Sequence, residues 1–175
     1  MTQQSLPPAV GNPTPDFSLP DSTGLAVTLS EFRGRSCVVL VFLRGPFWRR
    51  HLRRLAEDEP RFRDAAACVI AVAPTTPDAV RDYVARDALP FPVLADPERA
   101  VFARYGVASR ATSLAQRPGL FIVDADGVVR FAHVRRLRGK LIHGRGAGRG
   151  AVHAVLGEDE KSVGAQGSCA PTTCC

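Results

Sequence analysis

The chain has 175 residues, of which 45% are hydrophobic and 23% charged, and this composition fits one ordinary globular domain with tails. No apolar stretch approaches the roughly 20 residues of a membrane span, and the first residues lack a signal peptide's basic start and apolar core. We therefore expect a cytoplasmic protein. The net charge of +6 is carried by arginine clusters at 44–54 and 135–149, but neither lies in a recognisable nucleic-acid module, so solvated surface is favoured over nucleic-acid binding.

The first part of the chain predicts an extended arm, two short strands and a central strand. Residues 1–15 contain four prolines and no apolar periodicity. Short strands are predicted around 16–19 and 25–29, with a turn at Asp21-Ser22-Thr23-Gly24 between them. Residues 37–43 are a continuous β-branched and apolar run, which is typical of a central strand covered on both faces.

The middle of the chain alternates helices with strands. Bulky or apolar residues at 47, 48, 51, 52 and 55 form a helical stripe with arginines on the other face, and this places His51 on the inward side near the helix start. The later elements are predicted as a buried strand at 68–73, a helix from Thr76 to about Asp87, a short strand at 91–95, and a helix from 96–98 to Tyr105 with Gly106 as its C-cap.

The end of the chain predicts a hairpin and then loses its pattern. Residues 119–123 and 128–133 read as two strands joined by the turn 124–127. The predicted fold is therefore α/β, with a central mixed sheet flanked by helices and closed by this hairpin. A last helix is predicted near 151–156. We expect an N-terminal arm at 1–10, one domain at 11–157 and a flexible, cysteine-containing tail at 158–175.

Five short stretches carry a likeness to a known family, and they are Gly11–Pro20, Val39–Phe42, Phe91–Pro97, Tyr105–Val107 and Arg117–Asp124. In this order the chain resembles the thioredoxin fold, and more specifically the peroxiredoxin family in its alkyl hydroperoxide reductase and thiol-specific antioxidant (AhpC/TSA) branch. The resemblance covers about residues 10–134. It implies an oxidoreductase of antioxidant ancestry that acts on a small-molecule peroxide with a thiol/disulfide partner protein.

The family's reactive cysteine is replaced in this chain. In the family the strand ends in Pro, a Thr follows four residues on, and the peroxidatic Cys comes three further; a related branch reads Arg-Gly-X-Trp-Cys-Pro-X-Cys. With Arg44 and Gly45 set on that second pattern, Trp48 and His51 fall at its two cysteines. Arg117 falls near the family's activating arginine, offset by Pro118.

A peroxidatic site needs a thiolate as nucleophile, and an imidazole cannot form the sulfenic acid intermediate. We therefore predict a family member without standard thiol peroxidase activity, a pseudoenzyme with His51, Trp48 and Arg117 at the family's catalytic positions. Two interpretations of His51 stay open. It is either a base or ligand kept neutral by the helix N-terminus, or, as we favour, a partly buried side chain that fills the vacated pocket.

The five cysteines fall into two groups. Cys37 and Cys68 lie inside predicted strands, where a packing role is favoured. Cys169, Cys174 and Cys175 crowd the last seven residues, where their sulfurs suit disulfide exchange or a soft metal ion such as Zn²⁺ or Cu(I). Residual redox chemistry, if any, is expected in this tail, and no other cofactor is expected. The alternative is a non-enzymatic protein whose thiol tail binds a soft metal or a protein partner. The substrate, reductant, metal and oligomeric state stay open.

Overall fold

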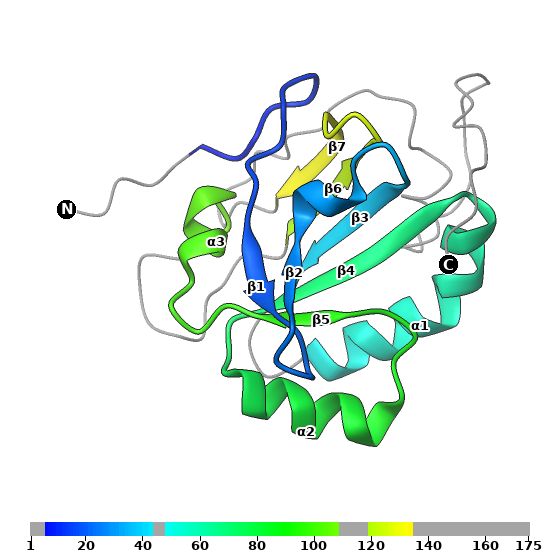
Figure 1. Cartoon of the computed structure of the whole chain (residues 1–175), viewed down its shortest axis with the longest axis vertical. Helices are drawn as coiled ribbons and strands as arrows, with labels where there is room; N and C mark the ends of the chain where they lie inside the picture. The colour runs from blue at the N-terminus through cyan, green and yellow to red at the C-terminus, as the bar shows by residue number, and fades with distance from the viewer. Residues whose placement is uncertain (1–5, 44–47, 109–118, 135–175) are drawn as a thin grey trace.

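A mixed five-stranded sheet forms the centre of the protein (Figure 1). The computed structural model describes residues 6–43, 48–108 and 119–134, and the side chains of 48–51 and 54 lie outside that description. The strand order is β5-β4-β3-β6-β7. Strands β3, β4 and β5 run parallel, whereas β6 is antiparallel to β3 and β7 to β6. The bounds are β3 (Cys37–Phe42), β4 (Ala67–Ala73), β5 (Val93–Ala95), β6 (Gly119–Val123) and β7 (Val129–Val134). The predicted α/β mixed sheet is confirmed.

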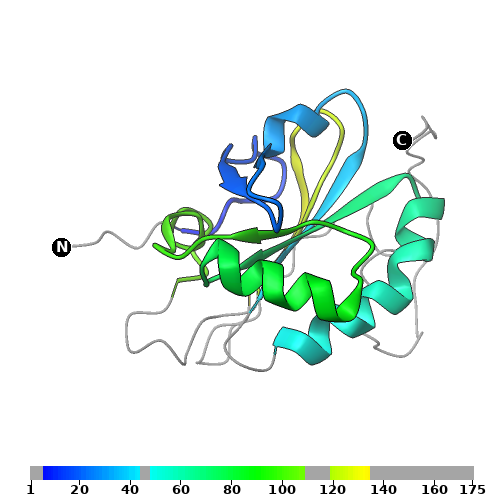
Figure 2. The same cartoon turned by 60° about the horizontal axis from the view of Figure 1, so that its bottom comes forward.

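Helices cover one face of the sheet. Strand β3 leads into α1 (Trp48–Asp64) and β4 into α2 (Pro77–Asp87). Because parallel β-α-β crossovers are right-handed, both helices lie on the same face, below the sheet in Figure 2. Leu52, Leu55 and Phe62 of α1 join Val39 and Val41 of β3 in the core on this side.

The other face carries shorter elements. They are the hairpin β1 (Ser18–Pro20) and β2 (Ala26–Thr28), the 3₁₀ helix η1 (Leu29–Phe32) and α3 (Ala100–Arg104). Val38, Leu40 and Phe42 of β3 point into this second core. Strand β3 is therefore buried on both faces, which explains why its sequence is continuously apolar rather than alternating.

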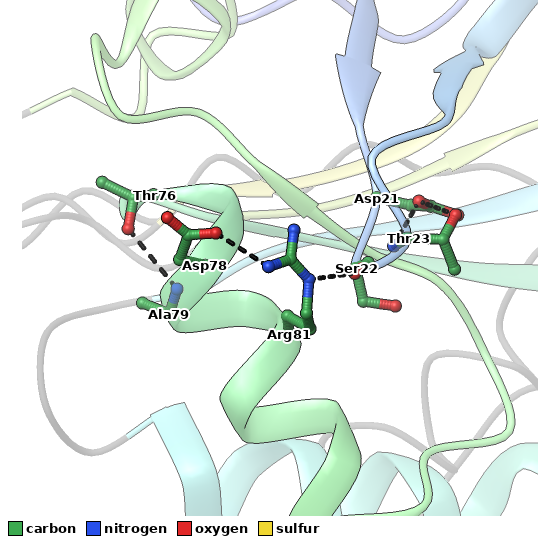
Figure 3. Close-up of polar contacts among 7 residues, drawn as sticks. All are labelled: Asp21, Ser22, Thr23, Thr76, Asp78, Ala79 and Arg81. Carbon is green, nitrogen blue, oxygen red and sulfur yellow. Dashed lines mark hydrogen bonds and ion pairs between the residues drawn. The ribbon is translucent and has the colours of Figure 1, made fainter.

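The β1–β2 turn is hydrogen-bonded to α2 (Figure 3). The Asp21 carboxylate accepts hydrogen bonds from the Thr23 backbone N–H and hydroxyl, both at 2.7 Å. Burial acts to raise the pKa of Asp21, but the hydrogen bonds from Thr23 and Leu25 hold it below its ordinary value. Arg81 of α2 donates to the Ser22 carbonyl oxygen at 3.3 Å and pairs with Asp78 at 2.9 Å. These contacts confirm the predicted turn.

The helix predicted from 96–98 is shorter than expected. It begins at Ala100, and Asp96 caps it from outside. The Asp96 carboxylate accepts from the backbone N–H groups of Ala100, Val101 and Phe102 at 2.9–3.0 Å. A carboxylate can satisfy the free N–H groups of a first turn without belonging to the helix, and this accounts for the difference.

Candidate functional site

The candidate site is the N-terminus of α1, just beyond the end of the central strand β3. The helix begins at Trp48, so the backbone of His51 belongs to its first turn. This confirms the predicted place of His51 near the helix start, and its predicted inward direction stays a prediction. The side chains of Trp48 and His51 lie outside the described residues, as do all of residues 44–47 between the strand and the helix.

The charge at this helix start is unusual. The first turn of α1 holds no acidic residue, whereas Arg49, Arg50 and Arg53 fall in its first two turns. The positive end of the helix dipole disfavours cations there, by about 0.3–1 kcal/mol each at an exposed position. The same field stabilises an anion, so a thiolate placed in this turn would be favoured.

In the second half of α1, two arginines form ion pairs with acidic residues of the same helix. Arg61 pairs with Asp58 at 3.3 Å, and Arg63 pairs with Glu59 at 2.9 Å. Both guanidinium groups are largely exposed, so these pairs are typical of a solvated helix face. Arg61 and Arg63 lie beyond the predicted cluster at 44–54, in which the described side chain of Arg53 is exposed, as the solvated interpretation expects.

An aromatic cluster supports the end of β3 from the opposite face. Phe42, the last residue of β3, meets Phe102 edge-on with ring centroids 5.1 Å apart, and Phe121 of β6 at 5.8 Å. Its ring also lies 5.0 Å from that of Tyr105. Edge-to-face pairs at these distances are favourable, so the cluster fixes the strand end from which the chain enters α1.

Tyr105 ties this cluster to the N-terminal segment. Its hydroxyl donates to the Pro15 carbonyl oxygen at 2.7 Å, and the neighbouring Arg104 donates to the carbonyl of Asp16. Burial raises the pKa of Tyr105 to about 12. The sequence marked Tyr105 as the end of a predicted helix and as part of a family-like stretch, and neither indicated its contact with Phe42.

Arg117 and the three tail cysteines lie outside the described residues. The description of β6 begins two residues after Arg117, at Gly119, which is the register partner of Phe42. A β-carbon on Gly119 would stand 2.6 Å from Cγ1 of Val107, so this position needs glycine. The start of β6 therefore lies beside the end of β3, the strand that leads to α1.

The two strand cysteines lie at the other end of the sheet. Cys37 is the first residue of β3 and Cys68 the second of β4, and these parallel strands begin at the same end of the sheet. At about 3.3 Å per residue, the length of β3 puts about 15–20 Å between this end of the sheet and the end of β3 that leads to α1. Both cysteines are half-buried. The Cys68 thiol donates to the buried Ser36 hydroxyl at 3.4 Å.

Two kinds of feature are absent from the part of the chain that the structure describes. No helix there is long and apolar enough to cross a membrane. Within residues 6–43, 48–108 and 119–134, no three His, Cys, Asp or Glu side chains gather in a way that could hold a metal ion. The predicted soft-metal set, Cys169, Cys174 and Cys175, falls in the tail and stays a prediction.

Comparison with known proteins agrees with this geometry. The family model described as the AhpC/TSA family matches residues 10–132. Alkyl hydroperoxide reductase E of Mycobacterium tuberculosis is 36% identical over 134 residues, which span 73% of this chain and 86% of that protein. The crystal structure of peroxidoxin BcpB from M. tuberculosis has a TM-score of 0.66 at 20% identity, covering 85% of this chain and 94% of that one. A thiol peroxidase from Chromobacterium violaceum has a TM-score of 0.61 at 24% identity, covering 74% and 78%. The likenesses to the two structures confirm the predicted fold.

Proposed function

The chain belongs to the AhpC/TSA family, and from that membership we propose that it is a peroxiredoxin-like protein without the family's thiol peroxidase chemistry at α1. The observation that carries the proposal is the backbone position of His51 in the first turn of α1. There the resemblance to the family implies a cysteine. Trp48 and Arg117 complete the set of family positions.

The chemistry follows from the side chain. A peroxidatic thiolate attacks one peroxide oxygen, the O–O bond breaks, and the sulfur becomes a sulfenic acid while the other oxygen leaves as water or an alcohol. An imidazole has no sulfur to oxidise in this way. Cys37 and Cys68 are poor replacements, because both lie at the end of the sheet opposite the N-terminus of α1.

Residual thiol chemistry, if present, is assigned to Cys169, Cys174 and Cys175. Oxidation of one tail thiol to a sulfenic acid, followed by attack of a second, forms a disulfide and releases water. A thiol/disulfide partner protein returns the two electrons by exchange. The chain between the last described residue and Cys169 is long enough for the tail thiols to meet one another or a partner protein. Residues 135–168 separate the last described residue from Cys169, and 34 residues span about 110 Å when extended.

Peroxide-dependent oxidation separates these assignments. The wild type, a chain truncated after Lys161 and a variant with Cys169, Cys174 and Cys175 all changed to Ser are treated with peroxide, and each sulfur is followed by mass spectrometry. We expect sulfenic acid or disulfide on the tail of the wild type alone. If the truncated chain or the triple variant still turns over peroxide, the assignment to the tail is wrong.

The second candidate is a non-enzymatic protein whose tail binds a soft metal or a protein partner. Three thiols within seven residues favour it, because thiolates are preferred ligands of Zn²⁺ and Cu(I). A Co²⁺ titration, followed by thiolate charge-transfer absorbance, tests the metal form, with the triple Ser variant as the control. Binding no tighter than that of an unrelated dithiol peptide would remove this candidate.

A further inference from the structure

Arg99 lies just beyond β5, at the end of the sheet where the parallel strands finish. Strand β5 leads through residues 96–99 into α3, and Arg99 is the residue before that helix (Figure 1). Its backbone is left-handed, with φ of 58° and ψ of 28°, a conformation that residues other than glycine rarely adopt. In α/β proteins, ligands bind outside the carboxyl ends of the parallel strands, and Arg99 lies at such an end.

The guanidinium group of Arg99 carries a buried donor without an acceptor. Arg99 is half-buried, and its Nε atom is buried with no hydrogen-bond partner in the part of the chain that the structure describes. The carboxylate of Asp96, three residues earlier, accepts from backbone N–H groups in the first turn of α3 instead. Among the described residues, no acidic side chain forms an ion pair with Arg99.

An unpaired buried donor on a charged group is costly. A guanidinium group stays protonated in proteins, so burial cannot neutralise it, and the cost of a missing acceptor is larger than for a neutral donor. Two other arginines show the usual arrangement, because Nε of Arg81 donates to the Ser22 carbonyl oxygen and Nε of Arg130 to the Asp124 carboxylate. A buried donor that lacks such a partner needs an explanation, and a bound anion supplies one.

We propose that Arg99 binds an oxyanion, the phosphate or carboxylate group of a small molecule, at the carboxyl end of β5. A guanidinium group holds such an anion side-on through Nε–H and one terminal N–H together, and this arrangement requires a free Nε–H. Arg99 is half-buried rather than fully buried, so the anion can enter from solvent. The negative charge of Asp96 is offset by its three backbone donors. The inference does not depend on the proposed loss of peroxidase chemistry at α1.

NMR spectra of the arginine Nε–H groups in the full chain test the proposal. Inorganic phosphate is titrated at constant ionic strength against chloride, and the Arg99 resonance is identified by its loss in Arg99→Lys. We expect this resonance to shift saturably, while that of the exposed Arg86 does not. In calorimetry, Arg99→Gln should bind phosphate at least about 10-fold more weakly than the wild type. A parallel titration with acetate distinguishes a phosphate site from a carboxylate site, since the tighter anion identifies the ligand's group.

Ala88 provides a matched control for the backbone conformation, because its φ of 43° is also left-handed. Arg99→Gly and Ala88→Gly each place glycine at a left-handed position, but only Arg99→Gly should lose the rise of the thermal unfolding midpoint with phosphate. Equal phosphate binding by the wild type and Arg99→Gln would overturn the proposal. So would the absence of a saturable shift of the Arg99 resonance with either anion.

Discussion

Cys37 and Cys68 lie on neighbouring parallel strands, yet their side chains project to opposite faces of the sheet. Cys37 is the register partner of Ala67, and Cys68 that of Val38. Ala67 packs against the core on the face that α1 and α2 cover, whereas Val38 belongs to the core on the other face. Register partners share a face and adjacent residues alternate, so the two thiols point apart.

No disulfide between Cys37 and Cys68 should therefore form, because their Cβ vectors diverge. The variant with all three tail cysteines changed to Ser is treated with a thiol oxidant, and its peptides are mapped without reduction. As a positive control, Ala67→Cys adds a thiol that is the register partner of Cys37 on the same face, and it should cross-link. A Cys37–Cys68 disulfide formed by the native fold would show that the register of β3 and β4 is different.

Tyr105 should make stability sensitive to alkaline pH. Its pKa is raised to about 12 in the folded state, against an ordinary value of 10.0, so folding favours the neutral phenol. This contribution is complete below pH 10 and is lost as the pH rises from 10 towards 12, by up to about 2–3 kcal/mol. Urea unfolding between pH 8 and 11.5 should show less alkaline destabilisation in Tyr105→Phe than in the wild type.

A matched control comes from the other tyrosine of the chain, Tyr83. In Tyr83→Phe, the phenolate absorbance reports Tyr105 alone, and it should appear only near pH 12 or together with unfolding. A phenolate that forms near pH 10 while the protein stays folded would contradict the burial of this hydroxyl.

The buried Asp96 should stabilise α3 through its three backbone hydrogen bonds. Asp96→Ala leaves the N–H groups of Ala100, Val101 and Phe102 without their acceptor, and we expect a loss of about 1–2 kcal/mol or more in the free energy of unfolding. Asp78→Asn serves as the control, since it removes an exposed ion pair with Arg81 and should cost about 0.5 kcal/mol or less. Equal losses in chemical denaturation would contradict the capping role.

Gly119 should not tolerate a side chain. The β-carbon of Gly119→Ala would meet Val107 at 2.6 Å and the Phe121 ring at 3.2 Å, so we expect a loss of about 1–3 kcal/mol in the free energy of unfolding. Val107→Ala in the same chain should recover part of that loss. Fully additive effects in this double-mutant cycle would show that the two positions do not meet.

Much of this fold is predictable because it depends on local pattern. The apolar run of β3, the turn at Asp21–Gly24 and the helix start at Thr76 each follow from the residue types at those positions, and the structure confirms them. The predicted inward stripe of α1 is confirmed at Leu52 and Leu55, which are buried. The same stripe predicted that His51 lies near the start of this helix, and the backbone of α1 confirms that place.

The remaining features depend on contacts between segments that are distant in sequence. The contact of Tyr105 with Pro15 joins residues 90 positions apart, and no local pattern predicts it. Likewise, the apolar setting of Cys37 and Cys68 predicted a packing role for both, but only the register of β3 and β4 shows their opposite directions. The expectations for Arg117 and the tail cysteines stay predictions, because those residues lie outside the described ranges.

The start of α1 should still activate a thiol if one is supplied. In His51→Cys, the helix N-terminus and the nearby arginines should lower the pKa of the new thiol below its ordinary value of about 8.5. Alkylation rates against pH, with the modified residue located by mass spectrometry, measure this. Arg63→Cys places a thiol in the last turn of the same helix and should show no such lowering. Identical profiles for the two variants would mean that the helix start does not stabilise an anion.

Peroxide consumption tests most directly whether the start of α1 lacks thiol peroxidase chemistry. It is measured in excess dithiol for the variant with Cys169, Cys174 and Cys175 changed to Ser, with and without His51→Cys. With His51 in place, we predict consumption no faster than that of the same concentration of free cysteine. When the dithiol is left out, the variant with the added His51→Cys change should give a sulfenic acid that can be trapped at position 51. Catalytic consumption of peroxide by the tail-substituted chain that retains His51 would contradict the account.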